Sequence, residues 1–561
     1  MLLNYADLTL SPLAYPTQTY SYHTCLQNTI VVYHTIWHNT AATCMTGQGV
    51  ARMDNWNTAL ALTYHEETKH SYDSLLRDRH FLDWANQPRP FKEYLGLEAI
   101  PLPTALPVTA VPALFALASE PTRTPRPLSL ADLAYLLFYT AGVTRRRVYP
   151  GYGEMCFRAA ACTGALYHID LYVSVRDMPG LPAGVYHFDP QGFALRQLRQ
   201  GDYRQVLVEA SGHDPALHDA PVVLLGSDTF WRNAWKYRSR TYRHSFWDAG
   251  TILANLLAAA TALRVPAHLT LGFADEPVNA LLDLDITQEA VLFLGGLGTG
   301  QAPPTRVLPM PPLALAVAPL SAASHDYPAI TILHTASSLE TPADATDWRT
   351  AVPLPPAAPA PGTLFPLAPD TRATLPVATL EEVIRHRGSA RHFTEQPLAL
   401  AALSNILTAA VQPIPTDYQT DAGQHLNDLY LIVHAVTGLP SGAYVFHAQE
   451  QMLECLAAGD FRQQAGELAL GQDQAAEASA VVFCLCDLPS ILEAFGNRGY
   501  RAAQLEAGLM GGRMYLAAYA QGCSATGLTF FDDDVTDFFA PHATEKSVMF
   551  LIALGYVARR T

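Results

Sequence analysis

Apolar and polar positions along the chain follow two alternating patterns. Residues 129–142 and 398–411 place apolar side chains three and four positions apart, which predicts two amphipathic helices. Each is followed by short runs typical of strands, and then by a long apolar segment rich in small residues, 248–265 or 506–523, which predicts a buried helix. Helices and strands are mixed without a regular strand–helix–strand alternation, so the pattern predicts an α+β layer fold.

The predicted strands and turns occur twice along the chain. LPAGVYHF at 181 returns as LPSGAYVF at 439, IDLYVSV at 169 returns as NDLYLIV at 427, and VVLLGSD at 222 returns as VVFCLCD at 481. The two copies are 258 or 259 residues apart in every case. Because unrelated segments would not keep one spacing, the chain is predicted to contain two tandem copies of one domain, which form a pseudo-dimer within the chain.

Composition divides the chain into five parts. Residues 1–52 carry only Asp7 and Arg52 as charged side chains, whereas the sequence from Met53 onward is charged and amphipathic. Two interpretations stay open for 1–52: translation starts at Met53, or these residues are a genuine extra segment. A change to Pro and Ala at 301–376 predicts an extended linker. The predicted parts are an N-terminal extension of doubtful origin (1–52), a helical lead (53–115), a first domain (116–300), the linker (301–376) and a second domain (377–561).

The overall composition is that of a folded protein with more than one domain, since 49% of the 561 residues are hydrophobic and 15% are charged. The net charge of −16 argues against a nucleic-acid partner, because a phosphate backbone attracts basic surfaces. The eight cysteines form no CxxC pair, which argues against a zinc ribbon or a disulfide framework and favours a reducing cytoplasm. No apolar run reaches the roughly 18 residues of a membrane span, so no membrane association is expected.

One motif is suited to binding an anion. Arg387, Ser389 and Arg391 stand at alternate positions directly after a predicted helix. Alternate side chains of an extended segment point the same way, so two guanidinium groups and a hydroxyl would converge on a phosphate. A solvated basic surface patch is the alternative interpretation.

Two other clusters of polar side chains do not predict a metal site. His65 and His70 are five residues apart, which places them on different sides of a helix, unlike a metal-binding pair that is four apart. The acidic run 532–534 corresponds in the repeat to Asp275 at the start of a predicted helix. Helix capping is therefore the better interpretation there, and no metal is expected.

Several sequence blocks resemble a known family. The anion motif, the two long helices and FFDDDV at 530–535 resemble the nitroreductase superfamily, whose members are flavin-dependent homodimers with FMN at the dimer interface. The narrower resemblance, to the azoline dehydrogenases of the SagB and cyanobactin-oxidase type, is carried by YHEETKHSYDS (64–74), DWANQPRPFK (83–92), FRAAACTGALYHIDLYV (157–173) and WKYRSRTYRHSFWDAGTILANLLAAA (235–260). The resemblance covers essentially all of 53–557 and implies two nitroreductase-like domains with FMN between them.

The resemblance further implies one composite flavin site. In that family one subunit supplies an Arg-x-Ser-x-Arg phosphate clamp and the other a loop of small residues beside the flavin. Here the second domain keeps the clamp and the first keeps the loop at 161–164, whereas 119–130 and 420–430 lack the corresponding clamp and loop residues. One site is therefore expected to be intact and the other lost, although a turn packed for its own sake is the alternative for 161–164. The implied cofactor ligands are Arg387, Ser389, Arg391, Arg158, Ala161, Cys162, Thr163, Gly164, Gly527, Leu528 and Thr529.

Lys236 and Tyr237 resemble the Lys-Tyr pair of the azoline dehydrogenases, which implies that both are catalytic; the second copy has FGNRGYR there and lacks the lysine. A lysine acts as a general base only if burial or a neighbouring cation lowers its pKa from about 10.4. Arg238, Arg240 and Arg243 are close enough in sequence to supply that charge. The alternative is a basic stretch that leads into the following helix.

The resemblance implies an FMN-dependent dehydrogenase that oxidises peptide thiazolines or oxazolines to thiazoles or oxazoles. Two alternatives remain: an NAD(P)H-dependent flavin reductase of nitro, quinone or enone substrates, and a non-catalytic scaffold of a peptide-modifying complex. The expected partners are a peptide or small-molecule substrate, a cyclodehydratase and a second copy of the chain. Neither nucleic acid nor a membrane is expected as a partner.

Overall fold

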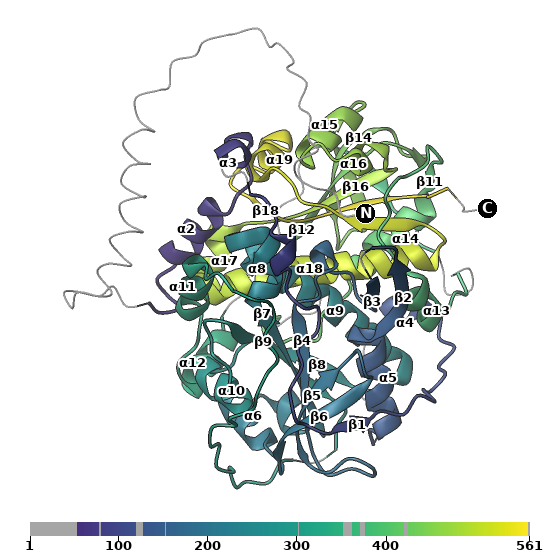
Figure 1. The fold of residues 1–561 in the computed structure, drawn as a ribbon. Coiled ribbons are helices and arrows are strands. Elements are labelled where there is room, and N and C mark those ends of the chain that lie inside the picture. The colour runs from purple at the N-terminus through teal and green to yellow at the C-terminus, as the bar shows by residue number, and fades with distance from the viewer. Residues whose placement is uncertain are drawn as a thin grey trace, which may run out of the picture.

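The computed structural model describes residues 53–77, 80–118, 127–151, 153–300, 302–351, 362–370, 376–419 and 424–558. The expectations for residues 1–52, and for most of the first copy's clamp position at 119–130, lie outside the described residues. Within them the chain forms two halves, each built on a seven-stranded sheet with helices packed around it (Figure 1). This confirms the α+β class and the tandem pseudo-dimer.

The two sheets have the same topology, and every neighbouring pair of strands is antiparallel. In the first half the order is β1 (Ala99–Pro101), β6 (Ala194–Gln200), β5 (Gly184–Asp189), β4 (Ile169–Val175), β7 (Val222–Thr229), β9 (Glu289–Leu297) and β8 (Ala267–Thr270). In the second half it is β10 (Thr363–Pro366), β15 (Met452–Ala458), β14 (Gly442–His447), β12 (Asp428–Val433), β16 (Ala480–Cys486), β18 (Ser547–Gly555) and β17 (Ser524–Gly527). Two small pairs complete the strands, β2 (Val143–Tyr149) with β3 (Gly153–Arg158), and β11 (Leu398–Ala399) with β13 (Val436–Thr437).

The helices also recur between the halves. The lead contributes α2 (Ala59–Glu67), α3 (Tyr72–Arg77) and α4 (Ala113–Ala118), and the segment between the halves contributes α11 (Pro328–Ala336) and α12 (Pro342–Arg349). The first half contains α5 (Leu130–Ala141), α6 (Arg204–Ala210), α7 (Pro215–His218), α8 (Phe230–Tyr237), α9 (Thr241–Leu263) and α10 (Asp275–Leu282). The second contains α13 (Leu380–His386), α14 (Leu400–Ala410), α15 (Arg462–Leu468), α16 (Asp473–Glu477), α17 (Leu488–Phe495), α18 (Asn497–Ala520) and α19 (Asp532–Phe538).

The halves meet along the two long helices, α9 and α18, which lie between the sheets (Figure 1). Gly250 and Gly508 occupy equivalent positions where these helices cross. A Cβ atom on Gly250 would collide with the Leu505 carbonyl oxygen, and one on Gly508 would collide with the Trp247 carbonyl oxygen. Glycine is therefore required at these two positions because the two backbones touch at this crossing.

Two equivalent sets of buried ion pairs join the halves. Asp275 of the first half bonds Arg498 at 2.6 Å and Arg501 at 2.9 Å, and Asp532 of the second half bonds Arg243 at 2.6 Å and Arg240 at 3.1 Å. Burial disfavours the charge on Asp532, but the two arginines outweigh it and hold its pKa well below the usual range. The capping interpretation is thus incomplete: Asp275 and Asp532 do begin helices, but neither side chain caps its helix, and both bind the opposite half.

The segment between the halves is more ordered than its composition predicts. The expectation of an extended linker is wrong for residues 328–349, which form α11 and α12. Trp348 of α12 is fully buried and donates a 2.9 Å hydrogen bond to the Phe495 carbonyl oxygen. Prolines at the first turn of both helices are compatible with helix formation, which the composition argument did not take into account.

One described helical stretch, Phe230–Leu263, is long and apolar enough to cross a membrane. Its apolar window is 94% buried inside the fold. This is the position of a core helix, and it agrees with the role of α9 at the interface between the halves.

Candidate functional site

The predicted phosphate clamp, Arg387 with Ser389 and Arg391, follows α13 and lies beside the edge strand β17. The Ala390 N–H donates to the Ala525 carbonyl oxygen at 3.0 Å, which fixes the clamp along that strand. The Arg387 guanidinium reaches across to the first half, where Nε donates to the Ala159 carbonyl oxygen at 2.9 Å and Nη2 to that of Arg158 at 3.1 Å. The clamp of one half therefore contacts the chain that leads into the small-residue loop of the other.

The two other clamp side chains are exposed. The Ser389 hydroxyl lies 3.2 Å from the Tyr515 hydroxyl, which also accepts a 2.6 Å hydrogen bond from the Gly527 N–H. Arg391 makes no hydrogen bond or ion pair with any residue of the described ranges. Its guanidinium group is therefore available to bind an anion.

The small-residue loop at 161–164 is held by a carboxylate of α9. Asp248 accepts hydrogen bonds from the Thr163 N–H at 2.9 Å, from the Thr163 hydroxyl at 2.9 Å and from the Cys162 thiol at 3.0 Å. Gly164 has φ +61°, and a Cβ atom there would lie 2.8 Å from the Tyr237 hydroxyl. Glycine is thus required both by the backbone conformation and by the approach of Tyr237.

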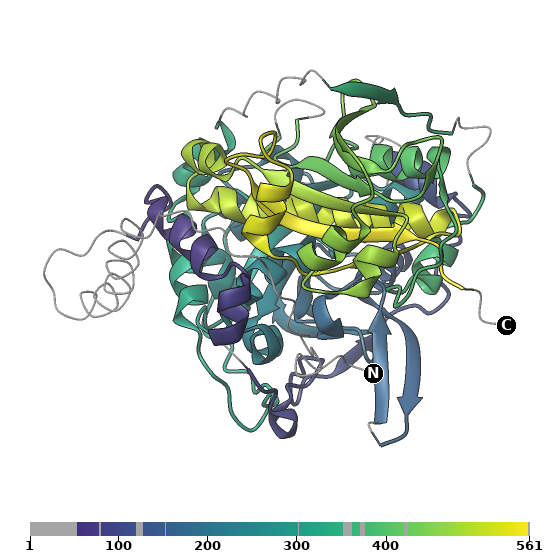
Figure 2. The same cartoon turned by 90° about the horizontal axis from the view of Figure 1, so that it is seen from above.

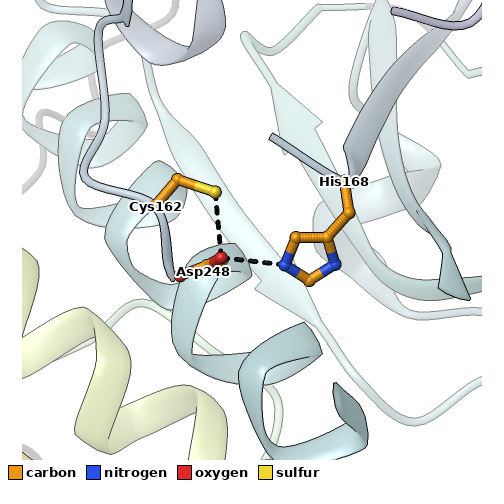
Figure 3. Close-up of side chains that lie close together, drawn as sticks. All are labelled: Cys162, His168 and Asp248. Atoms are coloured by element: carbon orange, nitrogen blue, oxygen red, sulfur yellow. Dashed lines mark hydrogen bonds and ion pairs between the residues drawn. The ribbon is translucent and has the colours of Figure 1, made fainter. Parts of the chain in front are cut away.

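His168, which follows the loop at 161–164, connects the Asp248 carboxylate to that of Asp228. Its Nε2 lies 2.8 Å from Asp248 (Figure 3). Its Nδ1 lies 2.7 Å from Asp228, and the side chain is not exposed to solvent. Burial alone would lower the pKa of His168, but the two carboxylates outweigh it and raise that pKa to about 9. His168 is therefore a charged brace, and both ring nitrogens are engaged.

Cys162, His168 and Asp248 offer three potential metal-ligand atoms within 4.8 Å of one another. The hydrogen bonds from the Cys162 thiol and His168 to Asp248 account for this proximity (Figure 3). Burial, followed by the Asp248 charge, raises the pKa of the Cys162 thiol well above its usual value, so the thiol keeps its proton and donates it.

Sequence reasoning did not identify Asp248 as part of the site. The available signal was the pair of carboxylates, Asp248 and Glu506, at equivalent positions of the repeat.

Arg158 forms the wall of a small cavity beside the loop, together with Ala161, Cys162, Tyr167 and Asp248. Its Nη1 donates to the Ile169 carbonyl oxygen at 3.2 Å and its Nη2 to that of Pro90 at 2.8 Å. Burial lowers the pKa of Arg158 to about 10. The Nε is buried and has no hydrogen-bond partner among the described residues.

Gly527 is the last residue of strand β17, beside which the clamp lies, and Leu528 and Thr529 follow it. The Leu528 N–H is bonded to the Leu551 carbonyl oxygen at 3.2 Å. The Thr529 hydroxyl is buried and has no hydrogen-bond partner within the described part of the chain. A buried hydroxyl without a partner is costly, and a bound polar group would remove that cost.

Lys236 and Tyr237 end helix α8 beside the loop. The Lys236 Nζ lies 5.1 Å from the centre of the Tyr237 ring, whose edge packs on His244 with 4.5 Å between ring centres. Burial lowers the pKa of Lys236, and the charge of Arg391 lowers it further.

The source of this second effect differs from the sequence expectation. Arg240 and Arg243 are bound to Asp532, and the cation that acts on Lys236 belongs to the clamp of the other half. Lys236 is thus placed where its proton is more easily released than that of an exposed lysine.

Comparison with known proteins gives the family. The model of the nitroreductase family matches residues 187–299 and 384–556, just over half of the chain. The chain belongs to the nitroreductase family. Both matched segments fall in the two halves that the repeat defines, so the match covers part of each copy.

Three relatives of this nitroreductase-family chain are informative. A solved structure from Anabaena variabilis, described as a “putative nitroreductase”, has 27% identity and a TM-score of 0.70, and the match covers 89% of this chain and 99% of that one. The trifolitoxin-processing protein TfxB of Rhizobium leguminosarum bv. trifolii is 31% identical over 193 residues, 33% of this chain and 52% of TfxB. A Methanocaldococcus jannaschii protein with the same description as the Anabaena structure is 27% identical over 158 residues, 28% of this chain and 76% of that protein.

In this nitroreductase pseudo-dimer, the clamp lies beside edge strand β17 of the second half. The equivalent position, beside edge strand β8 of the first half, is filled by residues of the chain itself. The Leu269 N–H of edge strand β8 donates to the Pro415 carbonyl oxygen at 2.7 Å, where β17 has the clamp. Two residues further along, the N–H groups of Leu271 and Gly272 donate to the Asp417 carboxylate at 2.9 and 2.7 Å. Leu271 and Gly272 correspond in the repeat to Leu528 and Thr529, so a carboxylate of the chain covers this second position.

Proposed function

We propose that this nitroreductase-family protein is an FMN-dependent dehydrogenase that oxidises thiazoline or oxazoline rings in a peptide to thiazoles or oxazoles. The observation that carries the proposal is the meeting of three elements from two halves: the clamp, the loop at 161–164 and the Lys236–Tyr237 pair. They are joined by the Arg387 hydrogen bonds, by the contact of Tyr237 with Gly164, and by the charge of Arg391 on Lys236.

The residues present fit FMN. Arg387 and Arg391 are two cations without a carboxylate partner among the described residues, which suits a phosphate. The unpartnered Thr529 hydroxyl and the Arg158 Nε are polar atoms that a bound flavin could satisfy. Ala161, Cys162, Thr163 and Gly164 would lie near the flavin, with Gly527 and Leu528 on the side of the clamp. Asp417 covers the equivalent position between the halves, which supports one FMN per chain.

When bound, FMN supplies an acceptor for two electrons and one proton. Oxidation of an azoline removes two hydrogens from adjacent ring carbons, one of which leaves as a proton. Lys236 is the residue proposed to take the proton of the α-carbon, because burial and Arg391 lower its pKa. Tyr237 would orient the ring against the loop. His168 is not a base in this scheme, since both its nitrogens are bound to carboxylates.

The similarity to TfxB supports a role in processing, since that relative is named for the processing of trifolitoxin. A peptide substrate would require an enzyme that forms the azoline rings beforehand, so we propose a cyclodehydratase as the partner and the cytoplasm as the compartment. A second copy of the chain remains a proposal for higher assembly.

The deciding experiment uses the purified full chain. Absorbance after denaturation counts the flavin, and anaerobic single-turnover mixing with an azoline-containing peptide follows its bleaching. Bleaching by the peptide, with one flavin per chain and formation of the azole, is the expected result. Rapid bleaching by NADPH alone, with no response to the peptide, would favour the flavin reductase. A chain that holds no flavin would favour the scaffold.

A further inference from the structure

The first half carries a β-hairpin that has no counterpart among the described residues of the second half. The chain from the end of α5 to the start of β4 has 27 residues, against 17 from the end of α14 to the start of β12. Much of the additional length forms strands β2 and β3, which project from the body of the molecule (Figure 2). The hairpin leads directly into the loop at 161–164, so this asymmetric insertion lies at the candidate flavin site.

The two faces of this hairpin differ in charge. On one face Arg145 pairs with Phe157 and Arg147 with Met155 across the strands. On the other, Arg146 is bonded to Glu154 at 2.9 Å and to the Gln191 carbonyl oxygen at 2.9 Å. We call the first the arginine face; it is formed by Arg145, Arg147, Met155 and Phe157. Within the described part of the chain, Arg145 and Arg147 have no carboxylate partner such as Arg146 has.

The arginine face adjoins the clamp. An Arg145 Nη2 lies 4.0 Å from where a Cβ atom on Gly388 would be, and the guanidinium packs over the Phe157 ring at 4.7 Å. The Arg145 Nε is buried without a partner, and Arg147 makes no hydrogen bond or ion pair with a residue of the described ranges. Burial lowers the pKa of Arg145, as do the charges of Arg147 and Arg387. Positive charge is therefore crowded at this edge, and no carboxylate of the described residues pairs with it.

This crowding stands out in a chain with a net charge of −16. A phosphate on the clamp would neutralise Arg387 and Arg391 but would leave the two arginines of the hairpin. Half-buried Met155 and Phe157 lie opposite these arginines on strand β3 and offer an apolar contact for an extended chain. An acidic peptide would be repelled by most of the surface and attracted to this edge.

We propose that the arginine face binds an acidic segment of the peptide substrate and guides the peptide to the flavin site. The proposal rests on the proposed function for its peptide substrate, and it names the chemistry of that peptide: carboxylate side chains close to the ring that is oxidised. Arg145 and Arg147 bind the carboxylates, and the hairpin holds the bound peptide next to the clamp.

Direct binding, without turnover, tests the proposal. The probe is a fluorescein-labelled synthetic peptide with four glutamates, compared with the same peptide carrying glutamines, and anisotropy is measured on the flavin-loaded full chain. Arg147→Gln and the double variant Arg145→Gln/Arg147→Gln are compared with Arg146→Gln, the matched control on the opposite face. Because Arg147 is exposed, its single variant tests binding without endangering the fold.

We expect wild type to prefer the glutamate peptide and the double variant to lose at least about tenfold in affinity for it. The single Arg147 variant should lose several-fold, while Arg146→Gln and flavin content should change less than twofold. Equal affinity of wild type for the two peptides, or unchanged binding by the double variant, would overturn the proposal. So would a loss of NADPH binding with peptide binding intact, since the face would then serve a nucleotide. A wild type that binds the glutamate peptide but oxidises no azoline would refute the proposed function and leave the docking face standing.

Discussion

The carboxylate of Asp248 should be required for the flavin site, and its counterpart Glu506 should not. Asp248 holds the loop at 161–164 through Thr163 and Cys162 and pairs with His168. Glu506 does the equivalent work in the other half, where it accepts hydrogen bonds from the Leu426 N–H at 2.7 Å and the Asn427 N–H at 2.9 Å. The two residues thus form a matched pair, one at the proposed flavin site and one at the position that the chain itself fills.

The magnitudes follow from what each substitution leaves behind. Asp248→Asn removes one of the two carboxylates that neutralise the buried His168, which should cost about 3 kcal/mol in the free energy of unfolding. Glu506→Gln keeps an acceptor oxygen but loses the charge in its hydrogen bonds, which should cost about 2 kcal/mol. Both variants are therefore destabilised, but only Asp248→Asn releases the loop. Its affinity for FMN should fall at least tenfold, or about 1.4 kcal/mol.

Urea unfolding gives the stabilities, and the flavin remaining after extended dialysis gives the retention of FMN. We expect Glu506→Gln to retain flavin as wild type does and Asp248→Asn to lose it. Wild-type flavin retention by Asp248→Asn would show that the loop does not hold the cofactor. Equal flavin loss by both variants would show that global stability, and not the loop, controls retention.

Three further outcomes are expected. Lys236→Ala and Tyr237→Phe should keep their flavin but slow azoline oxidation by about 10² to 10⁴; wild-type single-turnover rates in both would refute the assignment. Arg387→Ala should weaken FMN binding by about tenfold to a hundredfold, given roughly 1.5 to 3 kcal/mol for a charge-assisted contact, and a count of two flavins per chain in the wild type would contradict the single site. The pKa of His168 is raised from 6.5 to about 9 in the folded state, so its stabilising contribution is complete below about pH 6.5 and is lost as the pH rises through 9. The free energy of unfolding, measured from pH 6 to 10, should show this loss in the wild type and not in His168→Gln. The same loss in both proteins would exclude a stabilising role of charged His168.

The sequence by itself determined the repeat, the α+β class and the extent of the main elements. The periodicity at 129–142 and 398–411 predicts α5 and α14, which the structure has at Leu130–Ala141 and Leu400–Ala410. These features are local, because helix and strand periods are encoded within a few turns or residues. The same locality explains the failure at 328–349, where an average over Pro and Ala concealed two short helices.

Tertiary structure alone decided which side chains meet. The cation that acts on Lys236 is Arg391 of the other half. Arg240 and Arg243 are nearer to Lys236 in the sequence, but they are bound to Asp532. The hairpin and its arginine face also follow from strand pairing, which the sequence analysis did not predict. The physical reason is the crossing of α9 and α18 at their glycines: once the two backbones touch there, the clamp of one half must lie against the loop of the other. The sequence pattern of either copy does not encode the distance between the clamp and the loop, because that distance depends on how closely α9 and α18 pack.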